Sequence, residues 1–326
     1  MQKLVLGSLT LALALVGQAV SGEPYNPKQV PADAKWVIHV DIDAAQQSTL
    51  GKLVRDHLQG DPDFTRKSQE FETFTGTRLL DDIHAVLLFG REFEGPRSVL
   101  VIHAKLDANL LRQNLRTIKP DFGSKFHGDH EVMTWIDDNG VPIFACFHSP
   151  TATVISQSFD EMGASLDVLD GKAAGLRADS LMAAKSALGT FLFVASDRLQ
   201  DLARRNKDVS PITRSADAGA ITFGESDRQL FLHGMLVSSS NELARQTRMA
   251  LDGLRTFVVM AANDKNKPVD ARTAAIADML RSATVDVKDR MVSVELKLNV
   301  NAILQLLPRE LGGQAVETPV DAGKGN

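Results

Sequence analysis

Residues 36–43 have the sequence Trp-Val-Ile-His-Val-Asp-Ile-Asp, and the expected fold class follows from this stretch. Every second residue from Trp36 to Ile42 is apolar, which is the period of a β-strand. Asp43 then predicts a helix N-cap, because Gln46 follows three residues later and completes a capping-box pattern. A strand that leads directly into a helix predicts a fold built from both kinds of element.

The same order of elements recurs further along the chain. A second apolar strand begins at Phe191, and Asp197 and Gln200 after it repeat the spacing of the first cap and its partner. The turn at residues 137–140, Asp-Asp-Asn-Gly between apolar runs, predicts a β-hairpin. Repeated order indicates a tandem duplication. We therefore expect an α+β fold of two similar halves, each an antiparallel sheet with helices packed on one face.

The N-terminal residues predict the compartment. Lys3 precedes an apolar run that is too short and too interrupted for a membrane span, and small residues follow it. This is the pattern of a cleaved secretory signal peptide, so we expect an extracytoplasmic protein, periplasmic or secreted. The expected divisions are signal peptide 1–22, first half 23–172, linker 173–188, second half 189–308 and disordered tail 309–326.

Composition narrows the range of partners. The 326 residues carry a formal net charge of -5 and no basic stripe, which argues against a nucleic-acid partner. No segment after the signal is apolar enough to span a membrane. An envelope or extracellular protein or a small ligand is the expected partner. The single cysteine, Cys146, lies in an apolar run and predicts a small buried side chain rather than a reactive thiol.

His39 and Asp41 form the first candidate metal site. Positions i and i+2 of a strand project from the same face, so both side chains can approach one metal ion or polarise one water molecule. Asp43, at the end of the strand, can join them. The alternative is that this face of the strand simply meets solvent and that Asp43 only caps a helix. A third or fourth ligand cannot be placed from the sequence.

His127 and His130 form the second candidate metal site. They flank Gly128-Asp129, and a two-residue turn there would place the two imidazoles opposite each other, with Glu131 on the other side. Two imidazoles at a loop tip can bind Zn, Cu or Ni. The alternative is a polar turn without a ligand, since Gly, Asp and His are common in turns.

Catalytic motifs are absent from the sequence. It contains no Gly-x-Ser-x-Gly elbow, no phosphate-binding Gly-rich loop, no His-Glu-x-x-His and no Gly-x-Gly-x-x-Gly. The sequence therefore assigns no catalytic residue, and the cofactor, if any, is unknown.

The segment Pro31-Ala32-Asp33-Ala34, running into the strand at 37–41, resembles the opening of exported bacterial proteins of unknown function. In those proteins a Pro-Ala-Asp segment leads into the first strand. The resemblance covers residues 23–43 and the repeated layout. Those proteins carry no established catalytic residues, so the resemblance favours a protein that is not an enzyme, leaves the question open, and transfers no site residue.

Three functions follow from these observations. The first is an exported, soluble, non-catalytic binding or scaffold protein. The alternative is a metal-dependent periplasmic enzyme or metal-handling protein that uses His39 and Asp41, or His127 and His130. A third is a carrier of an apolar ligand, which requires an enclosed pocket between the apolar helix at 241–262 and its sheet.

Overall fold

The computed structural model describes residues 24–93, 95–184, 186–205, 214–262, 276–277, 279–298 and 300. The expected signal peptide, the expected tail and a last helix expected at 301–307 lie outside these residues. Among the described helices, none combines the length and the apolar character that crossing a membrane requires.

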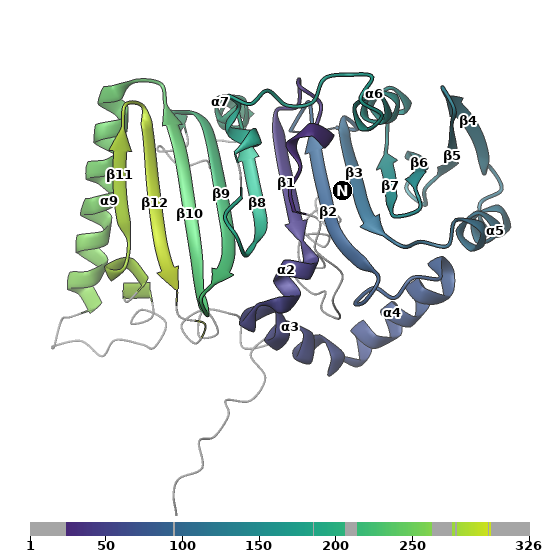
Figure 1. Cartoon of the computed structure of the whole chain (residues 1–326), viewed down its shortest axis with the longest axis horizontal. Coiled ribbons are helices and arrows are strands. Elements are labelled where there is room, and N and C mark those ends of the chain that lie inside the picture. Colours follow the sequence, from purple (N-terminus) through teal and green to yellow (C-terminus); the bar gives the residue numbers. More distant parts are fainter. Residues whose placement is uncertain are drawn as a thin grey trace, which may run out of the picture.

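A single sheet of twelve strands, in which every neighbouring pair is antiparallel, runs through the described residues (Figure 1). The spatial order is β11-β12-β10-β9-β8-β1-β2-β3-β7-β6-β5-β4. The strands are β1 (Trp36–Asp41), β2 (Ile83–Gly90), β3 (Ser98–Ala104), β4 (Gly123–His127), β5 (His130–Ile136), β6 (Pro142–Ser149), β7 (Ala152–Ser156), β8 (Thr190–Ser196), β9 (Ala216–Ser226), β10 (Gln229–Ser238), β11 (Thr284–Lys288) and β12 (Met291–Leu298). The α+β class expected from the sequence is confirmed.

The earlier and later strands form one continuous sheet because β1 pairs with β8. His39 lies opposite Phe193 of β8 on one side and opposite Leu87 of β2 on the other. The sequence left open whether the two expected halves share one sheet, and in the structure β1 and β8 are interior strands of a single sheet.

Helices cover both faces of this sheet, whereas one covered face was expected within each half. Val86 of β2 packs in the cluster that contains Phe64 of α4, whereas the next residue, Leu87, packs in the cluster that contains Met162 of α6. Successive residues of a strand point to opposite faces, so α4 and α6 lie on opposite faces. The helices are α2 (Ile42–Gln47), α3 (Thr49–Gln59), α4 (Pro62–Thr75), α5 (Ala108–Ile118), α6 (Phe159–Leu169), α7 (Leu199–Arg205), α9 (Asn241–Ala262) and the short 3-10 turns η1 (Pro27–Gln29) and η2 (Leu181–Ala183).

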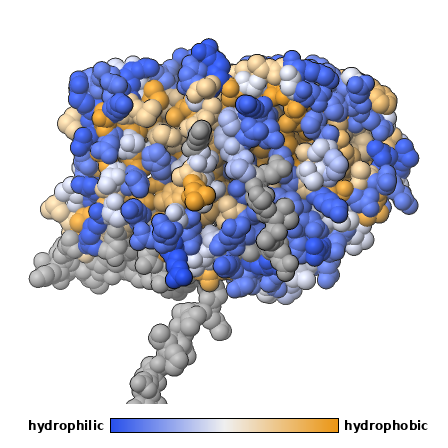
Figure 2. Space-filling model, viewed as in Figure 1, coloured by the Kyte–Doolittle hydropathy of each residue, from blue (hydrophilic) through white to orange (hydrophobic). Residues whose placement is uncertain are grey.

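The arrangement of the elements is plain in Figure 1. α9 runs along one end of the sheet, while α2, α3 and α4 follow its lower margin. The surface seen from the same side mixes hydrophilic and apolar side chains, with the apolar ones showing between the others over the sheet (Figure 2).

The junction between β1 and α2 differs from the expected one by two residues. Asp41, not Asp43, is the N-cap, since its Oδ1 accepts a hydrogen bond of 2.8 Å from the backbone N–H of Ala44. Asp43 lies in the first turn of α2, where a negative charge is also favourable, and its Oδ1 is 3.2 Å from Nδ1 of His84.

Local patterns placed several other elements correctly. The hairpin turn at 137–140 is confirmed, with Gly140 in the left-handed region at φ 78°. Apolar residues at helical spacing also predict a helix at 159–169, and this helix and the one expected at 241–262 have the expected bounds. β4 was not expected, because this outer strand is polar and lacks an apolar alternation.

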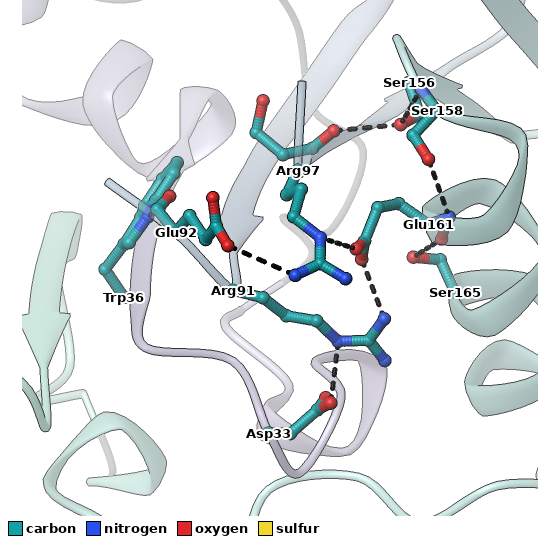
Figure 3. Close-up of polar contacts among 10 residues, drawn as sticks. Asp33, Trp36, Arg91, Glu92, Arg97, Ser156, Ser158, Glu161 and Ser165 are labelled. Carbon is teal, nitrogen blue, oxygen red and sulfur yellow. Dashed lines mark hydrogen bonds and ion pairs between the residues drawn. The ribbon is translucent and has the colours of Figure 1, made fainter. Parts of the chain in front are cut away.

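A buried carboxylate ties α6 to the sheet (Figure 3). The side chain of Glu161 is 6% exposed, and it accepts from Arg91 Nη1 at 2.8 Å and from Arg97 Nε at 3.1 Å. Arg91 also forms a 2.8 Å ion pair with Asp33 through Nε, although this N–H makes no hydrogen bond. Arg97 reaches Glu92 at 3.1 Å. The cluster therefore joins the segment before β1, the connection between β2 and β3, and α6.

We expect Glu161→Gln to lower the free energy of unfolding by about 3 kcal/mol, because it leaves two arginines without their shared buried charge. Urea denaturation measures this loss. Glu242→Gln is the matched control: Glu242 pairs with Arg245 at 2.7 Å on the exposed surface of α9, so its loss is expected to be far smaller. Equal losses in the two variants would contradict a structural role for the cluster.

Candidate functional site

Two histidines and an aspartate meet at one corner of the sheet. His130 lies at the start of β5, His148 near the end of β6, and Asp170 at the C-cap of α6. His130 Nε2 is 2.9 Å from Asp170 Oδ2, and His148 Nε2 is 3.0 Å from Asp170 Oδ1. One ligand atom from each residue lies within 4.8 Å of the other two. We call this group the His-His-Asp cluster.

Local irregularities of the backbone bring the three side chains together. The register between β6 and β7 shifts between Phe147 and Ser149, so His148 lies at a β-bulge, a feature that re-aims side chains. α6 ends at Leu169, and Gly171 takes the left-handed conformation at φ 73°. This ending places the carboxylate of Asp170 beside the two imidazoles.

The cluster is partly shielded from solvent. The side chains of His130, His148 and Asp170 are 18%, 20% and 17% exposed, although Asp170 as a whole residue is exposed through its backbone. Lys172 Nζ lies 2.8 Å from Asp170 Oδ2. Hydrogen bonds from Lys172 first, and then from His130, hold the pKa of Asp170 well below its usual range. Asp170 is therefore ionised, and a positive charge already lies against it.

The composition of the cluster suits a divalent transition metal. Two imidazole nitrogens and one carboxylate are ligands that zinc and neighbouring metals accept, and three protein ligands leave a coordination position open. Cys146 lies two residues before His148, but its sulfur does not belong to the group of ligand atoms that lie within 4.8 Å of one another. The expectation that Cys146 is a small buried side chain is confirmed.

The imidazoles of His127 and His130, which the sequence had paired, contact different carboxylates in the structure. His127 and His130 lie opposite each other across the expected turn. However, His127 Nε2 contacts Asp167 Oδ1 at 3.0 Å, whereas His130 contacts Asp170. Within the part of the chain that the structure describes, the one group of three ligand atoms this close contains His130 and omits His127.

His39 and Asp41 lie elsewhere, buried on β1. They are 5% and 7% exposed, and they line a cavity beside Tyr25. The described residues do not place a third metal ligand within the same 4.8 Å of them. The two side chains therefore share a cavity but do not form a three-ligand group.

The sequence did hold a signal for His148. The β5–β6 hairpin pairs Met133 with Ala145 and Ile136 with Pro142. Continuing this register by three residues from Met133 sets His130 opposite His148, so the turn at 137–140 already implied the pair. No such signal existed for Asp170, because it lies at the C-cap of α6, outside the hairpin that contains the two histidines.

Comparison with known proteins gives a distant structural likeness. No family model matches the chain. No curated protein matches it either. Crystal forms III, IV and I of TP0453, a Treponema protein, are similar with TM-scores of 0.47, 0.48 and 0.38 and identities of 8%, 7% and 9%. The aligned regions cover 87%, 88% and 88% of this chain and 96% of TP0453 in each form. No site residue is transferred from a likeness this distant.

Burial makes Asp41 costly to ionise. Desolvation raises its pKa from 3.8 to about 6, against the opposing hydrogen bond from Ala44. The folded state therefore binds more protons than the unfolded state between these two values, and stability falls as the pH rises through this window.

We expect Asp41→Asn to remove the loss of stability that accompanies ionisation of Asp41. Asparagine caps a helix as well as aspartate, so the variant should match the original chain near pH 4 and exceed its stability near pH 7 by up to about 3 kcal/mol. Urea midpoints at the two pH values measure the difference. Asp61→Asn, the same change at the exposed N-cap of α4, is the control and should show no comparable gain. An Asp41→Asn variant that is less stable at both pH values would contradict the raised pKa of Asp41.

Proposed function

We propose that the chain is an exported, non-catalytic binding protein that holds a divalent transition-metal ion at His130, His148 and Asp170. One observation carries the proposal: two imidazole Nε2 atoms converge on the same carboxylate from three separate elements. Export is supported by the signal-peptide pattern of residues 1–22. Binding rather than catalysis is supported by a sequence without hydrolytic or nucleotide-binding motifs and by the resemblance of its opening segment.

Lys172 is part of the proposed binding reaction. Its ammonium lies on Asp170 where the metal would bind, and its side chain is 55% exposed, so it is free to move into solvent. Metal and ammonium therefore compete for one carboxylate. Imidazole binds a metal only through an unprotonated nitrogen, so acid should weaken binding as well.

We further propose that the fold arose by tandem duplication and that the metal centre uses an inserted hairpin. The strand order outward from the central pair is β1-β2-β3-β7-β6 on one side and β8-β9-β10-β12-β11 on the other, which supports this origin. β4 and β5 have no counterpart among the described strands. His130 lies on that additional hairpin, so the duplication would not supply a second copy of the site.

We expect calorimetric titration of the chelator-free protein with Zn²⁺ to give one equivalent per chain. His130→Ala and His148→Ala should each weaken binding by at least about 100-fold, because even outer-shell partners of a metal contribute 10- to 100-fold. Lys172→Ala should tighten binding, since it removes the competing ammonium.

The matched control is His57→Ala, which removes an imidazole from α3, away from the cluster. Circular dichroism checks that each variant is folded. Zinc binding that survives both His130→Ala and His148→Ala unchanged, or that falls equally in His57→Ala, would contradict the proposed centre.

A further inference from the structure

A second candidate site is a cavity of about 820 Å³ beside β1. None of the residues of the His-His-Asp cluster lines it. Tyr25, His39, Asp41, Thr190 and the β9–β10 turn are among the residues around it. We call it the β1 cavity. It is larger than the hollow of about 630 Å³ beside His148.

The charges around the β1 cavity are mainly negative. Three carboxyl groups line it, those of Asp41, Glu225 and Asp227, against one guanidinium, that of Arg228. Glu225 is held by Thr49, whose backbone N–H and hydroxyl donate to it at 2.6 Å and 2.7 Å. Such a lining favours a cation over an anion.

Asp41 is the buried member of this set. The ion pairs formed among the described residues do not include it, and its capping bond to Ala44 requires an oxygen rather than a charge. A buried carboxyl group that lines a cavity and forms no ion pair among the described residues is a candidate for binding a cation.

Two hydroxyl oxygens of residues that line the cavity lack a hydrogen-bond partner among the described residues. Thr190 is 9% exposed, and its Oγ1 is buried without a hydrogen-bond partner among the described residues. The same holds for Oγ of Ser186, which also lines the cavity. Both oxygens are shielded from the solvent in the cavity, so a bound molecule would reach them only after these side chains turn.

An aromatic ring forms one wall. The ring of Tyr25 lies 5.5 Å from that of His39 and 4.8 Å from that of Phe193, and its hydroxyl donates to the carbonyl of Met182 at 2.7 Å. These contacts fix the ring in place. A fixed aromatic face beside a buried carboxyl group suits an ammonium ion attached to a short carbon chain.

We propose that the β1 cavity binds a small primary amine as its ammonium cation. The ammonium group lies on the carboxylate of Asp41, and the carbon chain lies along Tyr25. A diamine reaches the acidic rim at Glu225 and Asp227 with its second ammonium group. This site does not depend on the proposed metal centre.

The test is calorimetric titration of the chelator-treated, metal-free chain with n-butylamine and with putrescine, at about pH 7.5, where Asp41 is ionised. The amines are expected to bind and n-butanol, which has the same chain without the charge, is expected not to bind. Putrescine should bind more tightly than n-butylamine. Binding should weaken at least about tenfold at pH 5, where Asp41 is protonated.

Asp41→Asn should weaken amine binding at least about tenfold, because it removes the charge and keeps the helix cap. Asp61→Asn and His130→Ala should leave amine binding unchanged, and His130→Ala separates this site from the metal centre. Failure of both amines to bind at about 10 mM, a level that would detect millimolar affinity, would overturn the proposal. Equal binding by Asp41→Asn, or binding of succinate in place of the amines, would overturn it as well.

Discussion

The pairing of β1 with β8 is the contact on which the rest of the architecture depends. It joins strands about 150 residues apart in the chain, with Val37 opposite Ala195 and His39 opposite Phe193. Val37 and Phe193 are fully buried at this seam. Because β1 also pairs with β2, residues 36–40 are flanked by a strand on both sides, whereas Asp41 at the end of β1 pairs with Ala85 of β2 alone. The buried histidine of β1 is a direct result of its central position.

The two candidate sites arise from different kinds of irregularity. The proposed metal centre lies where regular structure ends: a bulge in β6, a tight turn before β5 and the end of α6 each contribute one side chain. The β1 cavity lies where β1 passes into α2, so that its carboxyl group serves both as cap and as lining. The two candidate sites have no residue in common.

Sequence reasoning succeeded where the signal was local. The helix at 159–169 and the Asn-Gly hairpin followed from periodicity and turn chemistry within a dozen residues. It missed β4, whose polar side chains carry no alternation, and it could not foresee the seam between β1 and β8, which depends on distant contacts. His130 was identified from its turn, but its contact with Asp170, which His148 shares, was not predicted. The bulge at His148 and the helix end at Asp170 are tertiary features without a short sequence pattern.

The sheet is open, so its outermost strands β4 and β11 each present a row of backbone groups that no neighbouring strand of the sheet pairs. Both are only five residues long. β4 carries Lys125, whose ammonium lies 5.4 Å from the centre of the Phe159 ring, and β11 ends in Lys288. Short edges bearing lysine disfavour strand addition by a second copy of the chain. The two edges of the described sheet therefore both carry features that disfavour end-to-end association of its copies.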